Sequence, residues 1–292
     1  MKKIYTIIAT ALCMMACSSE NKEVPTPQPE PEISQIPINI MLNDWTRATD
    51  TSFENGDKVG IYVVNNPEKF VTKGNHADNV KYNYTGVWNP EKPIYWKDKT
   101  TTADFYCYHP YTSAIEDITK LRISVKEDQS TLPAYKSSEF LYGKVKNIAP
   151  STNPVKINVK HMMSNLYIYL KPGKGYKTEE LKSAIVKIRG LKTEATANLA
   201  TGKLTPTGSA AEITPLEEDG HFRAMIVPQS INDVKLVYVK IGDREYNLTK
   251  SMTFTPGKKH KCTITVNKTG SGVNIDIDDW EEDEEDYGGE VE

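Results

Sequence analysis

Short stretches in which apolar and polar residues alternate recur along most of the chain. In the stretch QIPINIML, the residues Ile36, Ile38, Ile40 and Leu42 occupy every second position. Because successive side chains of a strand point to opposite faces, this spacing predicts a strand with one buried face. Pro37 has no N–H to donate to a ladder, so we expect the strand at an edge or a terminus of a sheet.

The same alternation continues to the C-terminal part of the chain. In ADFYCYHPY, the residues Phe105, Cys107 and His109 share one predicted face, whereas Tyr106 and Tyr108 share the other. TEELKSAIVKIRGL predicts a short turn that enters a strand. Further strands are predicted at NGDKVGIYVV, LRISV, FLYGKV, VKINVKH, SNLYIYL, FRAMIVP, VKLVYVKIG, REYNLT, KKHKCTITV and GVNIDID. No helix of any length is expected, and the pattern indicates an all-β protein built of β-sandwiches.

Composition supports the all-β prediction and divides the chain. The 16 tyrosines and the recurring valines and isoleucines favour strands. The segment at residues 147–155 carries two prolines among small polar residues, which is typical of a linker. We therefore expect one β-sandwich domain at residues 34–150 and a second at residues 151–280.

The N-terminus has the order of a secretory signal. Lys2 and Lys3 precede an apolar run that ends at Ala16, and this run is shorter than the roughly 20 residues that a membrane-spanning helix needs. Ala16 before Cys17 resembles a bacterial lipobox, in which the cysteine thiol is diacylated and becomes the first residue. Residues 1–16 are thus predicted to be a lipoprotein signal peptide; an ordinary signal peptide with an incidental cysteine is the alternative.

Residues 17–33 are predicted to be a tether. Prolines stand at positions 25, 27, 29 and 31 within an otherwise polar stretch, a composition that favours extended polyproline II structure. At about 3.1 Å per residue, such a segment spans on the order of 40 to 50 Å. The lipid anchor would hold the protein at the outer membrane through this spacer.

Charge is polarised along the chain. The net charge is −3, but residues 276–292 hold 11 acidic residues and no basic one, so residues 1–275 carry +8. The acidic tail at residues 281–292 is expected to be solvated. The basic residues are dispersed among tyrosines and threonines, so nucleic acid is not an expected partner.

Several segments together resemble the fimbrillin-like proteins of Bacteroidales, the Mfa-like branch of the FimA superfamily, and they follow the order of that family. The segments are TRAT at 46–49, FENGDKVGIYV at 53–63, YWKD, ADFYCYHPY, VKHMMSNLYIYL at 159–170, AMIVPQSI at 224–231, FTPGKKHKCTITVNKTG at 254–270, and IDIDDW. The resemblance implies two tandem β-sandwich domains of the transthyretin-like type. It also implies a shaft, tip or anchor subunit of surface fimbriae that is exported as a lipoprotein.

The resemblance further implies a processing site. In this family an arginine-specific protease cuts after an arginine near the first strand, and the matching position here is Arg47, before Ala48. Taken without the family, Arg47 is a solvent-facing residue of a polar turn, and that alternative stays open.

Cleavage after Arg47 would release the strand at residues 36–42 and leave an open sheet edge. An unpaired edge is a template for the strand of another chain, so other fimbrial subunits are the expected partners through strand exchange. The candidate donor strand is the C-terminal one, in which Val273, Ile275 and Ile277 alternate with polar residues. The alternative, equally open, is that this strand completes its own domain.

No catalytic signature accompanies these features. GxSxG, HExxH, CxxC and a glycine-rich phosphate loop are all missing from the sequence, so we expect no enzyme, cofactor or metal site. His109 and His161 are expected to be structural. Cys107 and Cys262 alternate in phase with apolar neighbours and are expected to be buried thiols instead of a disulfide.

One aromatic group leaves a second function open. Trp88, Tyr95 and Trp96 could form a platform for a glycan, although core and hairpin packing is the favoured interpretation. The alternative function is therefore a monomeric, lipid-anchored surface adhesin that binds a glycan or another host or bacterial surface ligand.

Overall fold

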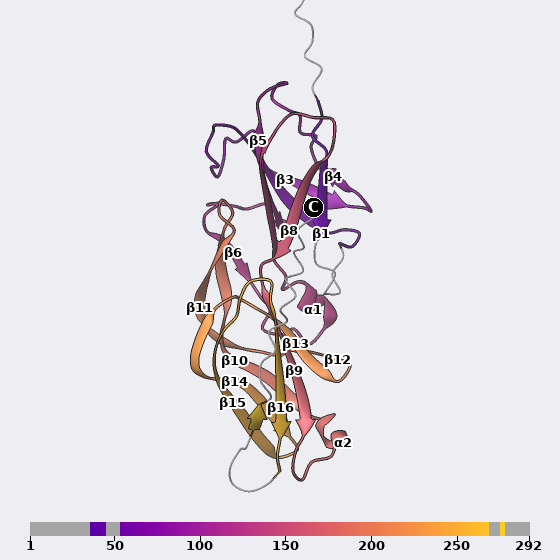
Figure 1. Ribbon diagram of the computed structural model, residues 1–292, viewed down its shortest axis with the longest axis vertical. Coiled ribbons are helices and arrows are strands. Elements are labelled where there is room, and N and C mark those ends of the chain that lie inside the picture. The colour runs from indigo at the N-terminus through magenta and orange to yellow at the C-terminus, as the bar shows by residue number, and fades with distance from the viewer. Residues whose placement is uncertain (1–35, 45–52, 269–274, 278–292) are drawn as a thin grey trace, which may run out of the picture. The chain divides into compact units, whose positions relative to one another are not determined.

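The computed structural model describes residues 36–44, 53–268 and 275–277 (Figure 1). The strands are β1 (Ile40–Asp44), β2 (Lys58–Asn65), β3 (Ala77–Tyr84), β4 (Trp88–Pro90), β5 (Ala103–His109), β6 (Leu121–Ser124), β7 (Leu141–Ile148), β8 (Val155–His161), β9 (Ser164–Pro172), β10 (Ile185–Asn198), β11 (Lys203–Ile213), β12 (Leu216–Glu218), β13 (His221–Ile226), β14 (Ser230–Ile241), β15 (Arg244–Thr253), β16 (Lys259–Val266) and β17 (Ile275–Ile277). The helices are α1 (Leu132–Lys136) and α2 (Thr178–Leu181). The all-β prediction is confirmed. Neither helix in these ranges has the length and apolar character needed to cross a bilayer.

Seven strands form the first sheet, in the order β1-β8-β7-β5-β2-β3-β4. Strand β1 is parallel to β8, whereas the other neighbouring pairs of this sheet are antiparallel. The predicted boundary at residues 150 and 151 falls between β7 and β8, yet these strands pair, so the sheet extends to His161. Gly143 permits their close approach, because a Cβ there would lie 2.5 Å from the main-chain oxygen of Asn158. The tandem transthyretin-like arrangement itself stays a prediction.

Strands β2 and β5 are buried on both faces. Phe105 and Cys107 of β5 lie in a cluster, here called the first core, with Val59 and Ile61 of β2. Tyr106 and Tyr108 of β5 point the other way, into a larger cluster called the second core. The predicted alternation of β5 is confirmed.

The C-terminal strands form two further sheets. One has the order β11-β10-β14-β15, with β6 paired to β10, and the other has the order β12-β13-β9-β16-β17. Leu166 and Ile168 of β9 meet Ile188 of β10 and Val237 of β14 in the second core. The two sheets therefore enclose a common core in the manner of a sandwich.

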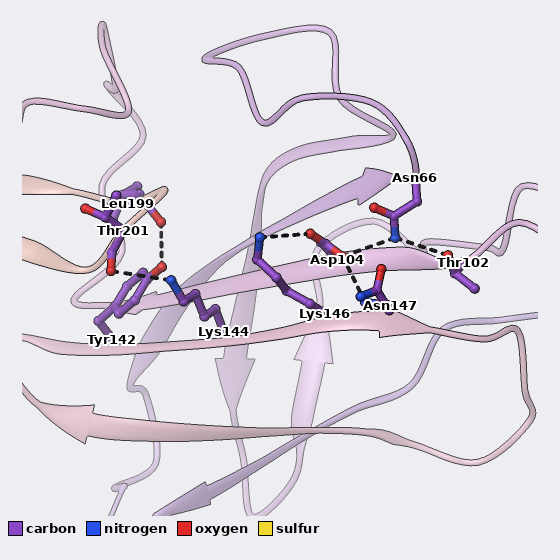
Figure 2. Close-up of polar contacts among 9 residues, drawn as sticks. All are labelled: Asn66, Thr102, Asp104, Tyr142, Lys144, Lys146, Asn147, Leu199 and Thr201. Atoms are coloured by element: carbon purple, nitrogen blue, oxygen red, sulfur yellow. Dashed lines mark hydrogen bonds and ion pairs between the residues drawn. The ribbon is translucent and has the colours of Figure 1, made fainter.

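Figure 2 shows the polar contacts that hold the β5–β7 pair. The carboxylate of Asp104 accepts hydrogen bonds from the side chain of Asn66 at 3.1 Å and from the main-chain N–H of Asn147 at 2.9 Å. On the same strand β7, the hydroxyl of Tyr142 donates to the main-chain oxygen of Leu199 at 2.6 Å. Tyr142 thus ties the first sheet to the turn between β10 and β11.

The two cysteines in the described residues are free thiols, as expected, and both are buried. Cys107 lies in the first core and Cys262 in the second, each with a relative exposure of 1%. Burial in apolar surroundings disfavours the thiolate. It raises the pKa of the Cys107 thiol far above its ordinary value and that of Cys262 to about 12.

We predict that neither thiol reacts with iodoacetamide at pH 8 in the folded protein, because the thiolate is the reactive form and both sulfurs are shielded. Both should become fully alkylated in guanidinium chloride. Peptide mass spectrometry of the labelled chain distinguishes these two cysteines from Cys13 and Cys17. Alkylation of Cys107 at native conditions would contradict its place in the first core.

Candidate functional site: the first strand and its groove

The segment at residues 36–44 reaches two separate parts of the first sheet. Its later half is β1, which pairs in parallel with β8 so that Ile40 lies opposite Val155 and Asp44 opposite Val159. The main-chain N–H of Val155 donates to the oxygen of Asn39 at 2.8 Å. This half of the segment forms one edge of the sheet, as Pro37 predicts (Figure 1).

The earlier half of the segment pairs with the chain that follows β4. The N–H of Ile38 donates to the oxygen of Ile94 at 2.8 Å, and the N–H of Trp96 donates to the oxygen of Ile36 at 2.9 Å. Strand β4 ends the sheet on the side opposite β1. Residues 36–44 therefore pair both with β8 and with the chain that follows β4, the last strand at the opposite end of the sheet. No local pattern in the sequence predicts this double pairing.

The four predicted apolar positions of this segment all face the first core. Ile38 and Ile40 are 3% and 8% exposed, and Ile36 and Leu42 pack against the same cluster while partly exposed. Met41, which lies between two of these positions, is 43% exposed. The predicted one-sided burial is confirmed, and the segment covers one side of the first core.

We predict that Ile38→Ala lowers the free energy of unfolding by about 2–5 kcal/mol, because it removes a buried side chain and leaves a cavity. The matched control is Met41→Ala in the same segment, which should change this free energy by about 0.5 kcal/mol or less. Urea denaturation of the two variants measures the difference. Equal losses would show that the segment does not pack as described.

Three predicted sites lie outside the described residues: Cys17, Arg47 and Ala48. In sequence, Arg47 follows Asp44, the end of β1, by three positions, and the described chain resumes at Phe53. The Phe53 ring packs edge-on against Trp88 at 4.8 Å between ring centroids. In sequence, the predicted processing site therefore lies between β1, which is paired with β8, and Phe53, which packs on Trp88.

The candidate donor strand pairs within its own chain in this structure. Strand β17 is antiparallel to β16, with Ile275 opposite Val266 and Ile277 opposite Ile264. Val273 lies outside the described residues. The pairing corresponds to the alternative in which the strand completes its own sheet, and donation to a second chain stays a prediction.

A small cluster of ionisable groups lies beside Phe53. His161 Nδ1 is 2.7 Å from Glu139 Oε2, and the carboxylate of Glu139 is buried. His109 Nδ1 lies 3.0 Å from the main-chain oxygen of Lys58, so its N–H donates there. His109, Glu139 and Asp57 border a cavity of about 70 Å³, which is too small for a substrate. Both histidines thus contact the fold's own groups, in line with the structural role expected of them.

Burial holds the pKa of the His109 imidazole below its usual value, against the opposing effect of the Asp57 and Glu139 carboxylates. The ring is neutral in the folded state, whereas the unfolded chain takes up a proton near pH 6.5. Stability contributed by His109 is therefore present above that pH and is lost as the pH falls below it, by at most about 1.4 kcal/mol per pH unit.

We predict that the free energy of unfolding falls between pH 7 and pH 5 and that His109→Gln makes this fall shallower. His76→Gln is the control, because His76 contacts the main-chain oxygen of Tyr95 at the surface. Denaturation curves at each pH give the slopes. An unchanged slope in the His109 variant would refute the assignment.

The three residues of the predicted aromatic platform, Trp88, Tyr95 and Trp96, have different surroundings in the structure. Trp96 is 5% exposed and packs edge-on against Phe105 in the first core. Trp88 packs on Phe53, and Tyr95 is 39% exposed. Core and hairpin packing is therefore confirmed for Trp96, which cannot present its face to a glycan in this state.

Two further observations bear on ligand chemistry. Across the described ranges, no three His, Cys, Asp or Glu side chains are grouped so that they could hold a metal ion. A cleft of about 620 Å³ runs along β6, lined among others by Tyr111, Arg122 and Glu194. Its walls are mixed in polarity and include two aromatic residues, Tyr111 and Phe140.

Comparison with known proteins relates this architecture to one family. The model of the fimbrillin-like family matches residues 46–280, which is most of the chain. A protein of Bacteroides uniformis named "Putative fimbrium subunit Fim1C" is 27% identical over 298 residues, which covers 95% of this chain and 94% of that protein.

Two crystal structures share the fold. One, described as a "putative cell adhesion protein" from Bacteroides uniformis, has a TM-score of 0.65 and 22% identity, covering 86% of this chain and 99% of that chain. Another, with the same description and from Bacteroides ovatus, has a TM-score of 0.67 and 17% identity, covering 86% and 98%. At these identities the likeness establishes the fold, including the sandwich-like sheets.

Proposed function

Because the chain belongs to the fimbrillin-like family, we propose that it is a structural or accessory subunit of surface fimbriae, acting as a shaft, tip or anchor component. The family match and the fimbrium subunit from Bacteroides uniformis support a fimbrial or adhesive role at the cell surface. A role in assembly, instead of catalysis, accords with a site made of a strand and its groove.

Export as a lipoprotein is the second part of this proposal. It rests on the sequence order of a basic start, an apolar run, Cys17 and a proline-rich spacer. The lipid on Cys17 would hold the chain at the outer membrane until the first strand is detached. Uncut, the same residues would serve as a permanent anchor.

One observation carries the assembly mechanism. Residues 36–44 cover the first core with Ile38 and Ile40 and supply main-chain hydrogen bonds to both ends of the sheet. Cleavage after Arg47 would leave this segment attached to the rest only by those non-covalent contacts. Its release would expose an apolar groove and unpaired main-chain groups, which the strand of another subunit can satisfy.

The groove specifies its occupant by chemistry. An incoming strand must place apolar side chains at every second position, where Ile36, Ile38, Ile40 and Leu42 now lie. The C-terminal residues Val273, Ile275 and Ile277 have that spacing. Donation by one copy to the groove of the next would be head-to-tail and would propagate as a filament.

We predict that cleavage of the purified lipid-free precursor with an arginine-specific protease yields a new N-terminus at Ala48 and converts monomers to oligomers, because the freed groove accepts a strand of another copy. N-terminal sequencing, size-exclusion chromatography and electron microscopy provide the readouts. Arg47→Gln is the matched control and should remain monomeric under the same protease.

One outcome would contradict the self-assembling role. In it, the protease cuts cleanly before Ala48, the segment at residues 36–44 is separated in mild denaturant, and the protein still remains monomeric. That result would favour an anchor, a tip or a ligand-binding surface protein. Cleavage only at other arginines, with Arg47 intact, would refute the processing site. The groove would then be tested with an added peptide that has apolar residues at every second position.

A further inference from the structure

Strands β7 and β8 carry four lysines on the side of the sheet that faces away from the first core. These residues, here called the lysine face, are Lys144, Lys146, Lys156 and Lys160. On β8, Val155, Ile157 and Val159 are buried in the first core, so the lysines that alternate with them project to the other side. All four lysines are exposed.

The lysines of β7 project from the same side as those of β8. Tyr142 pairs with Lys160 across the β7–β8 ladder, and Lys144 lies two positions farther along β7. Lys146 is directed to this side as well, toward Asp104 of β5, as Figure 2 shows. The two lysines of β7 and the two of β8 therefore form one surface.

The charge of the lysine face is not balanced within the described residues. Lys144 donates to the main-chain oxygen of Thr201, a neutral acceptor, at 3.5 Å. The two lysines of β8 have no carboxylate partner in the described ranges. Asp104 lies 3.5 Å from Lys146, but its carboxylate is 8% exposed and already accepts two other hydrogen bonds. The face therefore presents an excess of positive charge to the solvent.

The segments around the lysine face supply little negative charge. Residues 140–161 contain no aspartate or glutamate, and neither does the adjoining turn at residues 198–203. Glu68, in the loop that packs on β5, is paired with Lys97 at 3.9 Å. The predicted acidic tail at residues 281–292 lies outside the described residues and does not enter this balance.

The side chains beside the lysines favour a polysaccharide over a protein or a nucleic acid. Tyr106 and Tyr142 are 5% and 7% exposed, so neither offers a ring on which a base could stack. Protein interfaces are enriched in aromatic residues and depleted in lysine, which is the opposite of this face. The amides of Asn43 and Asn158 bond to each other at 3.1 Å on the same side and offer further groups to sugar hydroxyls.

We propose that the lysine face binds a linear sulfated polysaccharide. At a rise of about 3.3 Å per residue, the two lysines of β7 are about 7 Å apart along the strand and those of β8 about 13 Å apart. A polymer with sulfate groups repeated along its length can contact several of these ammonium groups at once. The inference goes beyond the assembly role proposed above and does not depend on it, because the lysines lie on β7 and β8 and not on the strand that cleavage would release.

Binding of the uncut, lipid-free chain to immobilised heparin tests the proposal. We expect binding at about 0.1 M salt and its loss at about 1 M, because the screening length falls from about 10 Å to about 3 Å. Biolayer interferometry measures the dissociation constant. Failure of the unmodified chain to bind at the lower salt concentration, or binding that is unchanged at the higher one, would overturn the proposal.

Variants of the four lysines locate the binding surface. Replacing all four residues of the lysine face with Gln should raise the dissociation constant about tenfold or more. The matched control replaces four exposed lysines elsewhere with Gln and should change it by less than about threefold. The control positions are Lys92, Lys120, Lys126 and Lys235. Equal losses in the two variants would show that only net charge matters and would overturn the proposal.

Two further arms identify what the lysine face recognises. Replacing its four lysines with Arg keeps the charge and should keep the affinity within about threefold, whereas a tenfold loss would contradict recognition by charge. Duplex DNA at the same concentration of negative charge should displace the chain from heparin less effectively than free heparin does. Equal displacement by DNA would show a general response to polyanions and would overturn the assignment to a sulfated polysaccharide. Thermal unfolding of each variant verifies that the fold is unchanged.

Discussion

Strands β2 and β5 bury one face in the first core and the other face in the second core. The arrangement of the remaining strands depends on this double burial. Along both strands alternate side chains face opposite cores: valine, isoleucine, alanine, phenylalanine and cysteine face the first core, and tyrosine and valine face the second. A shift of one residue in the register of either strand would exchange the two sets and disrupt both cores together. Strands β2 and β5 thereby link the seven-stranded sheet to the core that the two five-stranded sheets enclose.

The separation of the two cores is compatible with the proposed release of the first strand. Residues 36–44 contact the first core, whereas the second core is completed by other strands. Tyr142 anchors β7 to the turn after β10 through a hydrogen bond that the first strand does not touch. Under the proposed mechanism, loss of the first strand would open a groove in the first core and would leave the second core, with its sandwich-like sheets, in place.

Period-two alternation sufficed to predict most strands and the buried face of residues 36–42, because alternation is a local property of the backbone. It did not reveal β11, whose polar and small residues, including Pro206 and Gly208, give no apolar alternation, or β3, in which the alternation is confined to Val80, Tyr82 and Tyr84 after a polar start. It also could not predict the contacts of Ile38 with Ile94 or of His161 with Glu139, since pairing between distant segments is decided by packing. Helix α1, capped by Thr131, was missed because a single turn lacks any periodicity.

The parallel pairing of β1 has a consequence for the order in which the chain folds. Asn43 meets Asn158 across 115 positions of sequence, so β1 cannot join its partner through a tight hairpin. Closing so long a loop costs conformational entropy before any contact is gained. We expect β1 to dock late, on a sheet already formed by the hairpins that follow it, and pulse-labelled hydrogen exchange would reveal delayed protection of its amides. If β1 docks last on a sheet that has already formed, the proposed exchange for a strand of another chain would require no unfolding of that sheet.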